Sequence, residues 1–378
     1  MTTLKTYCYF LAAFAAFFTS AASAFDVDGY GIVDTHYTTG DIFTDEEDGR
    51  YDWDLRRIKF SIKDDLKDNL KYKLSFKVNA DKGLLEFDDA YLTYEPIKRF
   101  DIKLGRFKVP FGLENLQSTK TLPLFERSIA SEVFTLSRSP GVSFQYKNSF
   151  FGVELGRFFR SAEDKDYEPG HVTSIRTRLF YGDHKDGLLH LGMGFNNEVV
   201  TDNKLRHEAV IVGGSVEDQI KGTKLSPNAI NTSNFEIAGL FHYLTLQAEL
   251  FSQRWVFEDD NPDKPDSTYE PDYYGSYMQA AVSFIGDGRR YEDGELEPDF
   301  KDGKFLEVAF RVNYVDLDYG DNRDYANSLD FAITYYPSKQ IKLAAQYQRG
   351  DLVSGNVGDI RLPETGSAFS LRMQFMFD

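Results

Sequence analysis

Short segments that alternate apolar and polar residues run along this chain as far as its C-terminal end. In the last segment Phe369, Leu371, Met373, Phe375 and Phe377 share one face, and the opposite face is mainly polar. Successive side chains of a β-strand point to opposite sides, so the pattern predicts a strand with one apolar and one polar face. A soluble sheet buries the apolar face, whereas a membrane barrel turns it towards lipid and keeps the polar face for a water-filled lumen. The rest of the sequence favours the barrel.

The alternation predicts sixteen strands. They are expected near residues 25–37, 52–64, 69–79, 84–94, 98–107, 140–147, 150–160, 171–181, 187–196, 234–242, 244–256, 272–285, 304–316, 328–336, 340–349 and 366–377. Most connections alternate between short and long, as in bacterial barrels with short periplasmic turns and long outer loops. Two connections break this alternation. The connection over residues 80–83 is short where a long loop is expected, and the connection over residues 286–303 is long where a short turn is expected. We therefore expect an all-β fold, a closed antiparallel transmembrane β-barrel of about 16 strands, with fourteen or eighteen as alternatives.

The first residues have the pattern of an export signal. Lys5 precedes an apolar run over residues 7–18, and Ala22-Ser23-Ala24 offers the small residues that a signal peptidase needs. The run is too short to cross a bilayer as an anchor. We expect a signal peptide over residues 1–24 and a barrel over residues 25–378, in the outer membrane of a Gram-negative bacterium.

Composition narrows the function further. Aromatic residues make up 15% of the chain, which suits the aromatic belts of a barrel, and the net charge of −17 argues against nucleic acid as a partner. The six histidines stand in no nucleophile or metal-ligand spacing, so we expect neither an enzyme nor a cofactor. Acidic clusters in residues 41–48 and 259–266 predict solvated outer loops. The alternative is that they bind divalent cations, between loops or to lipopolysaccharide phosphates. We expect lipopolysaccharide and outer-membrane lipid as partners of the barrel.

Basic residues fall on the polar faces of several strands, which would point into the lumen. These residues are Arg57, Lys59, Lys63, Lys71, Lys73, Lys77, Arg176, Arg178, Arg311, Lys342 and Arg372. Glu154, Glu249 and Glu307 fall on inward faces as well. An excess of cations on a low-dielectric wall predicts a pore that favours anions, and a polar wall of mixed sign is the alternative.

The long connection over residues 108–139 is the expected constriction. It carries Lys108, Lys120, Arg127 and Arg138 together with apolar residues such as Phe125. A loop this apolar would leave water, so we expect it to fold into the barrel and to present its cations to the pore. Two or three charge-assisted hydrogen bonds of about 1.5–3 kcal/mol each would bind an oxyanion and still allow its release.

Several motifs resemble those of the phosphate-selective porins of Gram-negative outer membranes. They lie at residues 55–60 (LRRIKF), 89–92 (DAYL), 105–112 (GRFKVPFG), 118–120, 125–128, 138–141, 286–290, 307–316 and 371–375. Their order and spacing match over most of the chain, and those in the N-terminal third are the most specific. The resemblance implies a sixteen-stranded homotrimer whose constriction loop binds phosphate through arginines and lysines.

The same resemblance assigns the residues of an anion site. It implies binding by Arg56, Arg57, Lys59, Lys108, Lys120 and Arg127, and it places Asp89 beside the lumen. We therefore expect an outer-membrane porin for the passive diffusion of small anions, with phosphate or polyphosphate as solutes. The alternative is a general, organic-acid or sugar porin of the same fold without a phosphate site.

Overall fold

The computed structural model describes ten stretches of the chain, namely residues 26–43, 49–79, 84–160, 170–183, 187–201, 204–213, 219–258, 271–292, 294–356 and 363–377. Sixteen antiparallel strands form one closed barrel, which confirms the predicted architecture. The expected signal peptide, the connection over residues 80–83 and most of the two acidic clusters lie outside the described residues. In the part of the chain that is described, no helix is long and apolar enough to cross a membrane.

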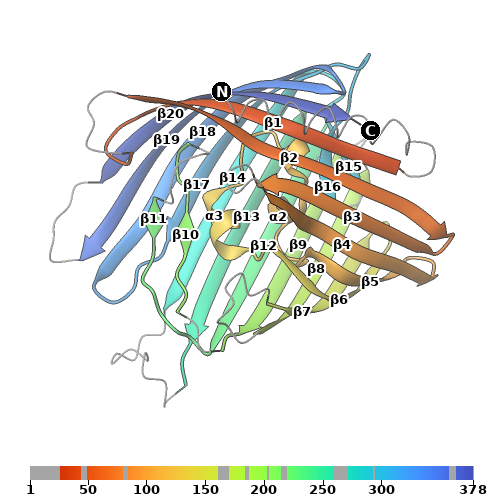
Figure 1. Cartoon of the computed structure of the whole chain (residues 1–378), viewed down its shortest axis with the longest axis horizontal. Helices are drawn as coiled ribbons and strands as arrows, with labels where there is room; N and C mark the ends of the chain where they lie inside the picture. The colour runs from red at the N-terminus through yellow and green to blue at the C-terminus, as the bar shows by residue number, and fades with distance from the viewer. Residues whose placement is uncertain are drawn as a thin grey trace.

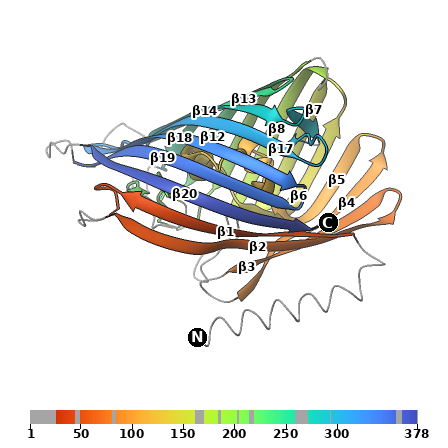
Figure 2. The same ribbon diagram turned by 90° about the horizontal axis from the view of Figure 1, so that it is seen from above.

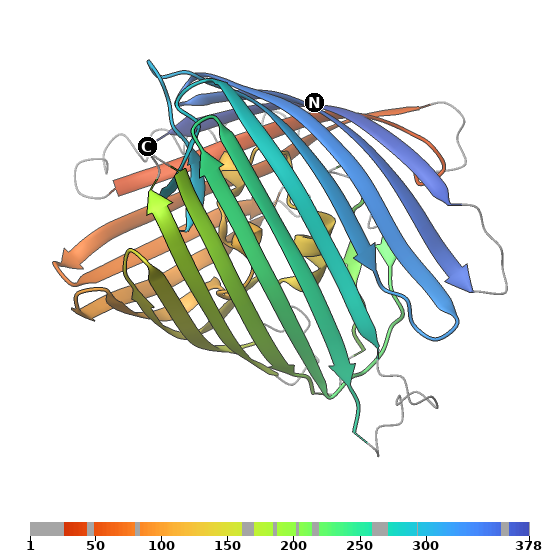
Figure 3. The same cartoon turned by 180° about the vertical axis from the view of Figure 1, so that it is seen from behind.

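The barrel strands follow one another around the wall in chain order (Figures 1 and 3). They are β1 (Asp26–Thr39), β2 (Arg50–Lys67), β3 (Leu70–Asn79), β4 (Leu84–Ile97), β5 (Phe100–Lys108), β6 (Arg138–Lys147), β7 (Phe151–Phe159), β8 (His171–Asp183), β9 (Gly187–Val199), β12 (Ala229–Phe241), β13 (Leu244–Val256), β14 (Asp272–Ile285), β17 (Phe305–Asp316), β18 (Asn322–Ser338), β19 (Ile341–Asn356) and β20 (Glu364–Phe377). Every strand expected from the sequence has its counterpart in this order.

The first and last strands close the barrel. β1 pairs with β20 in a register that sets Gly29 opposite Phe377 and Gly31 opposite Phe375. A Cβ at Gly29 would lie 2.4 Å from the Phe377 ring, so a glycine is needed for this ring to lie along the closing seam. The wall therefore has no unpaired edge at the point where the chain ends meet.

The two faces of the wall follow the predicted alternation. In β20 the Phe369 side chain is 47% exposed on the outer surface, whereas Arg372 is 3% exposed inside the barrel. The outward residues of the strand form an apolar surface, and the inward ones are polar or charged. The outer face suits contact with lipid, as expected of a membrane barrel.

Two connections at the long-loop end fold into the barrel (Figures 1 and 2). The first, residues 109–137, contains α2 (Leu113–Leu116), the 3₁₀ turn η1 (Thr119–Thr121) and α3 (Ile129–Phe134). The second, between β9 and β12, contains the short strands β10 (Glu208–Ala209) and β11 (Ile220–Lys221). Buried apolar residues from both connections, among them Phe134 and Ile211, join inward residues of the wall such as Trp255 in one core. This core attaches both connections to the inner face of the barrel wall.

A third segment enters from the opposite end. Residues 286–304, the long connection in a short-turn position, form a hairpin of β15 (Arg289–Glu292) and β16 (Glu295–Pro298). The Arg289 guanidinium donates to the Thr121 carbonyl at 2.8 Å, and Glu295 accepts from the Ser118 amide at 3.2 Å. These contacts explain the unexpected length of this turn, because the hairpin supports residues 109–137 from the short-turn end of the barrel.

Candidate functional site

A β-bulge lets two consecutive arginines of β2 contact the interior segment. Ile32 of β1 pairs with Arg57, but Asp34 pairs with Asp54, so β2 has one extra residue here. Arg56 Nε lies 3.0 Å from Glu126 Oε1, and Arg57 Nη1 donates to Thr119 Oγ1 at 2.8 Å. Strict alternation would send one of these two side chains to lipid, and the bulge removes that conflict.

A second bulge brings two aspartates of β4 to the same interior region. Leu74 pairs with Ala90 but Phe76 pairs with Phe87, which again leaves one extra residue on β4. Asp89 accepts from Lys59 Nζ at 3.2 Å and from Arg138 Nε at 2.6 Å. Asp88 contacts the same two cations, with its oxygens 2.5 Å from Lys59 and 3.1 Å from Arg138. The charges of Lys59 and Arg138 are therefore compensated by two carboxylates.

Lys108 and Arg127 approach one turn of the interior segment from two directions. Lys108 Nζ donates to the carbonyls of Asn115, Leu116 and Gln117 at 2.7, 3.2 and 2.8 Å. Arg127 Nη2 donates to the same Gln117 carbonyl at 2.8 Å. Both cations thus cap the C-terminal end of α2, where exposed carbonyls attract positive charge.

Arg57, Lys108 and Arg127 form what we term the turn cluster. Their hydrogen bonds go to a hydroxyl or to backbone carbonyls, and none of them forms a salt bridge with any residue that the structure describes. Burial inside the barrel lowers the pKa of Arg127, and the neighbouring Arg57 guanidinium acts in the same direction. The carboxylates of Glu114, Glu126 and Glu132 raise this pKa in turn, although none of them forms a salt bridge with Arg127 among the described residues.

Lys120 and Asp89, two of the predicted site residues, do not belong to the turn cluster. Lys120 lies in η1 and lines a separate cavity of about 260 Å³ at the short-turn end, next to Tyr336 and Phe377. Asp89 is placed inside the lumen, as the sequence analysis expected, and it contacts cations rather than solvent alone. The structure therefore brings Arg57, Lys108 and Arg127 to one turn, whereas Lys59 and Asp89 pair with each other and Arg56 pairs with Glu126. Lys120 lies apart from all of them.

Most other inward arginines are paired with carboxylates that the sequence did not identify. Arg176 binds Glu236 through two nitrogens at 2.8 and 2.6 Å, and Arg311 lies 2.8 Å from Asp330. The Glu154, Glu249 and Glu307 side chains also lie inside, as predicted. The partners come from other strands, so alternation along one strand gives each side chain's face but not its counterion.

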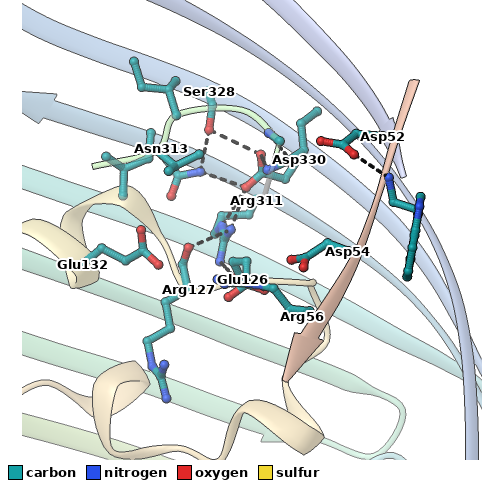
Figure 4. A pocket seen from close by; sticks show the side chains of 16 residues that line it. Asp52, Asp54, Arg56, Glu126, Arg127, Glu132, Arg311, Asn313, Ser328 and Asp330 are labelled. Carbon is teal, nitrogen blue, oxygen red and sulfur yellow. Dashed lines mark hydrogen bonds and ion pairs between the residues drawn. The ribbon is translucent and has the colours of Figure 1, made fainter. Parts of the chain in front are cut away.

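Two cavities lie on either side of the interior segment. The outer vestibule is a cavity of about 520 Å³ at the long-loop end, lined by β2, β17 to β19, the interior segment and residues 210–213 (Figure 4). The inner chamber, of about 390 Å³, lies towards the short-turn end and is lined by β2 to β8 and the hairpin. Arg56 and Arg127 line the first cavity, whereas Lys59, Lys108 and Asp89 line the second.

The comparisons with known proteins assign the chain to a family. A family model described as phosphate-selective porin O and P matches residues 31–377. The chain belongs to this family. Porin O of Pseudomonas aeruginosa is 23% identical to this porin over 334 residues, which span 77% of this chain and 74% of Porin O.

Solved structures share the fold of this porin. An anion-selective porin from Comamonas acidovorans aligns with a TM-score of 0.60 at 12% identity, over 94% of this chain and 99% of that chain. OprB of Pseudomonas putida aligns with a TM-score of 0.62 at 11% identity, over 93% and 94%. The trimer form of OmpT of Vibrio cholerae aligns with a TM-score of 0.57 at 15% identity, over 94% and 100%.

Family and barrel together place this porin in the outer membrane of a Gram-negative bacterium, as a channel and not an enzyme. Among the described residues, no group of three or more His, Cys, Asp or Glu side chains could bind a metal ion. The site is therefore described by its charged side chains and by the cavities that they line.

Removing the Asp89 charge should make this porin more anion-selective. In D89N one negative charge leaves the inner chamber while Lys59 and Arg138 stay. A unit charge about 6 Å from a passing ion in water contributes about 0.7 kcal/mol, with opposite sign for anions and cations, so the anion-to-cation permeability ratio should rise about tenfold. The reversal potential in a KCl gradient measures this ratio. D272N is the matched control, because Asp272 is also paired with an arginine, Arg254, but this ion pair is exposed. An unchanged or lower ratio in D89N would contradict the placement.

Proposed function

We propose that this porin is a passive diffusion channel for small anions, with phosphate among its solutes. The turn cluster is the observation that carries the proposal, because Arg57, Lys108 and Arg127 lie between two polar cavities and form no salt bridge with any described residue. Fixed positive charge in a narrow, low-dielectric passage attracts anions and excludes cations.

The chemistry of the cluster suits a tetrahedral oxyanion. Guanidinium groups donate in a planar fork that fits two oxygens of phosphate. Because Lys108 already donates to three carbonyls, its contribution is charge rather than a hydrogen bond. Two arginines that each contribute about 1.5–3 kcal/mol would bind phosphate transiently, which a conducting pore requires.

The description of the family and the name of one protein of similar fold support the proposal. The family model is described as phosphate-selective, and one protein of similar fold is described as an anion-selective porin. Because another solved relative is a trimer, we further propose a homotrimer whose apolar outer surface contacts lipid and lipopolysaccharide. The signal peptide over residues 1–24 also remains a proposal.

Added phosphate should block the chloride current of the purified porin in a planar bilayer. Phosphate that occupies the turn cluster occludes the path, so single-channel chloride conductance should fall as phosphate is added and should saturate. The wild-type protein is compared with R57Q, which removes one guanidinium from the cluster and should weaken the block about tenfold for the loss of one charge-assisted hydrogen bond. A linear, non-saturating response in both proteins would favour a general or organic-acid porin without a phosphate site.

A further inference from the structure

The outer vestibule and the inner chamber are lined by opposite charge. The vestibule lining has five carboxylates (Asp52, Asp54, Glu126, Glu132 and Asp330) against three guanidinium groups (Arg56, Arg127 and Arg311). The chamber lining has eight cations (Lys59, Lys73, Lys103, Lys108, Arg138, Lys147, Arg176 and Arg178) against four carboxylates (Asp89, Asp101, Glu154 and Glu295). An ion that crosses the pore therefore meets a negative region followed by a positive one.

Glu132 differs from its neighbours in the vestibule. Glu126 is bound by Arg56 at 3.0 Å, and Asp330 by Arg311 at 2.8 Å. The Glu132 carboxylate forms no hydrogen bond or salt bridge with any described residue, and its side chain is exposed. Figure 4 shows it projecting from α3 into the vestibule. Arg56, Arg127 and Arg311 act on this carboxylate electrostatically, but no direct contact with a described residue covers it, so its charge also acts on ions in the pore mouth.

We propose that Glu132 is a selectivity-determining residue that makes the outer vestibule favour cations, so that the channel conducts better when its outer side is positive. At this polarity cations enter the negative region and anions enter the positive region, and carriers accumulate between them. At the opposite polarity both carriers leave the pore and the current falls. This inference rests on the proposed function for the conducting path, but not for phosphate binding.

The surroundings of Glu132 make its charge sensitive to pH. Enclosure by the barrel and the Glu126 carboxylate raise the pKa of Glu132 to about 7, although the nearby arginines act in the opposite direction. The charged groups that line the vestibule with it are Glu126 and Arg127 on the interior segment, Asp52, Asp54 and Arg56 on β2, Arg311 on β17, and Asp330 on β18. A carboxyl group is neutral below its pKa, so acidification should remove this negative charge from the pore mouth.

The test is a current–voltage measurement on the full-length porin in a planar bilayer with KCl on both sides. Acidifying one compartment at a time, from about pH 8 to about pH 6, identifies the side that Glu132 faces. Wild-type current should be larger, by about twofold, when that same compartment is positive. Acidification of that side should reduce the asymmetry. E132Q should show a smaller asymmetry than wild type at about pH 8, and acidification should change it little.

E258Q is the matched control, because Glu258 is an exposed glutamate at the long-loop end that does not line the vestibule. It should keep both the asymmetry and its response to pH. A symmetric wild-type curve, or an asymmetry that E132Q leaves unchanged, would overturn the proposal. The reversal potential of wild type and E132Q in a KCl gradient separates the two claims, because a preference for chloride in both leaves the proposed function intact whatever the asymmetry shows.

Discussion

R127E should lower the anion-to-cation permeability ratio of this porin more than tenfold. Arg127 lines the outer vestibule, forms no salt bridge with a described residue, and donates to the carbonyls of Glu114 and Gln117. One unit charge about 5 Å from a monovalent ion in water contributes about 0.8 kcal/mol, and its reversal doubles the effect. The resulting change of about 1.6 kcal/mol has opposite sign for anions and cations, so the ratio should change by well over tenfold.

Companion variants separate the charge of Arg127 from the fold of its loop. R57E reverses a second charge of the turn cluster from the barrel wall, and it should lower the ratio in the same way. R127K keeps the charge and should stay near the wild type. K120E should have a smaller effect, because Lys120 lines a different cavity. R254E changes an exposed arginine that is paired with Asp272, and it is the matched control. Ratios within about twofold of wild type in both R127E and R57E would show that the turn cluster is off the ion path.

R372M should lower the stability of the barrel and widen the pore. The Arg372 guanidinium binds Asp34 at 2.8 and 2.6 Å, and Asp34 is fully buried. The same group donates to the Phe125 carbonyl at 2.6 Å and to Glu126 at 2.9 Å, so it connects the wall to the interior segment. Removing one partner of a buried pair costs about 3–5 kcal/mol of folding free energy, because the remaining charge has no compensation.

Two measurements distinguish the two effects of R372M. The temperature at which the folded band disappears in a heat-modification gel measures the stability of the barrel. Single-channel conductance measures the width of the pore. Because the double variant D34N/R372M removes both members of the pair, it should recover most of the stability. It should keep the larger conductance, since the Phe125 carbonyl still has no donor from the wall. Wild-type conductance in R372M would contradict a role of Arg372 in positioning the interior segment.

The barrel could be predicted from the sequence because each strand shows its lipid-facing side in its own residues. The closing strand is an example, since the alternation from Phe369 to Phe377 appears unchanged in the structure. The direction of Arg56 could not be predicted in this way. It depends on a bulge that is defined only by the pairing of β2 with β1, 20 or more residues away in the chain.

Counterions and loop contacts were the parts that sequence reasoning could not supply. Arg372 and Asp34 lie 338 residues apart and meet only because the barrel closes. Arg138 appeared in a family motif, but its pairing with Asp88 requires the second bulge, which no local pattern indicates. Carboxylates therefore compensate many of the predicted wall cations, and excess positive charge remains at the turn cluster and in the inner chamber. Lys120 was assigned to the site by motif, whereas the 3₁₀ turn directs it to another cavity.

The reversal potential of the purified full-length porin in a KCl gradient is the most direct test of this account. The turn cluster and the positive inner chamber predict a potential whose sign shows preference for chloride over potassium, and a stronger preference in D89N. A potential that favours potassium in the wild type would show that the carboxylates of the outer vestibule dominate permeation. It would contradict the assignment of this channel to anions.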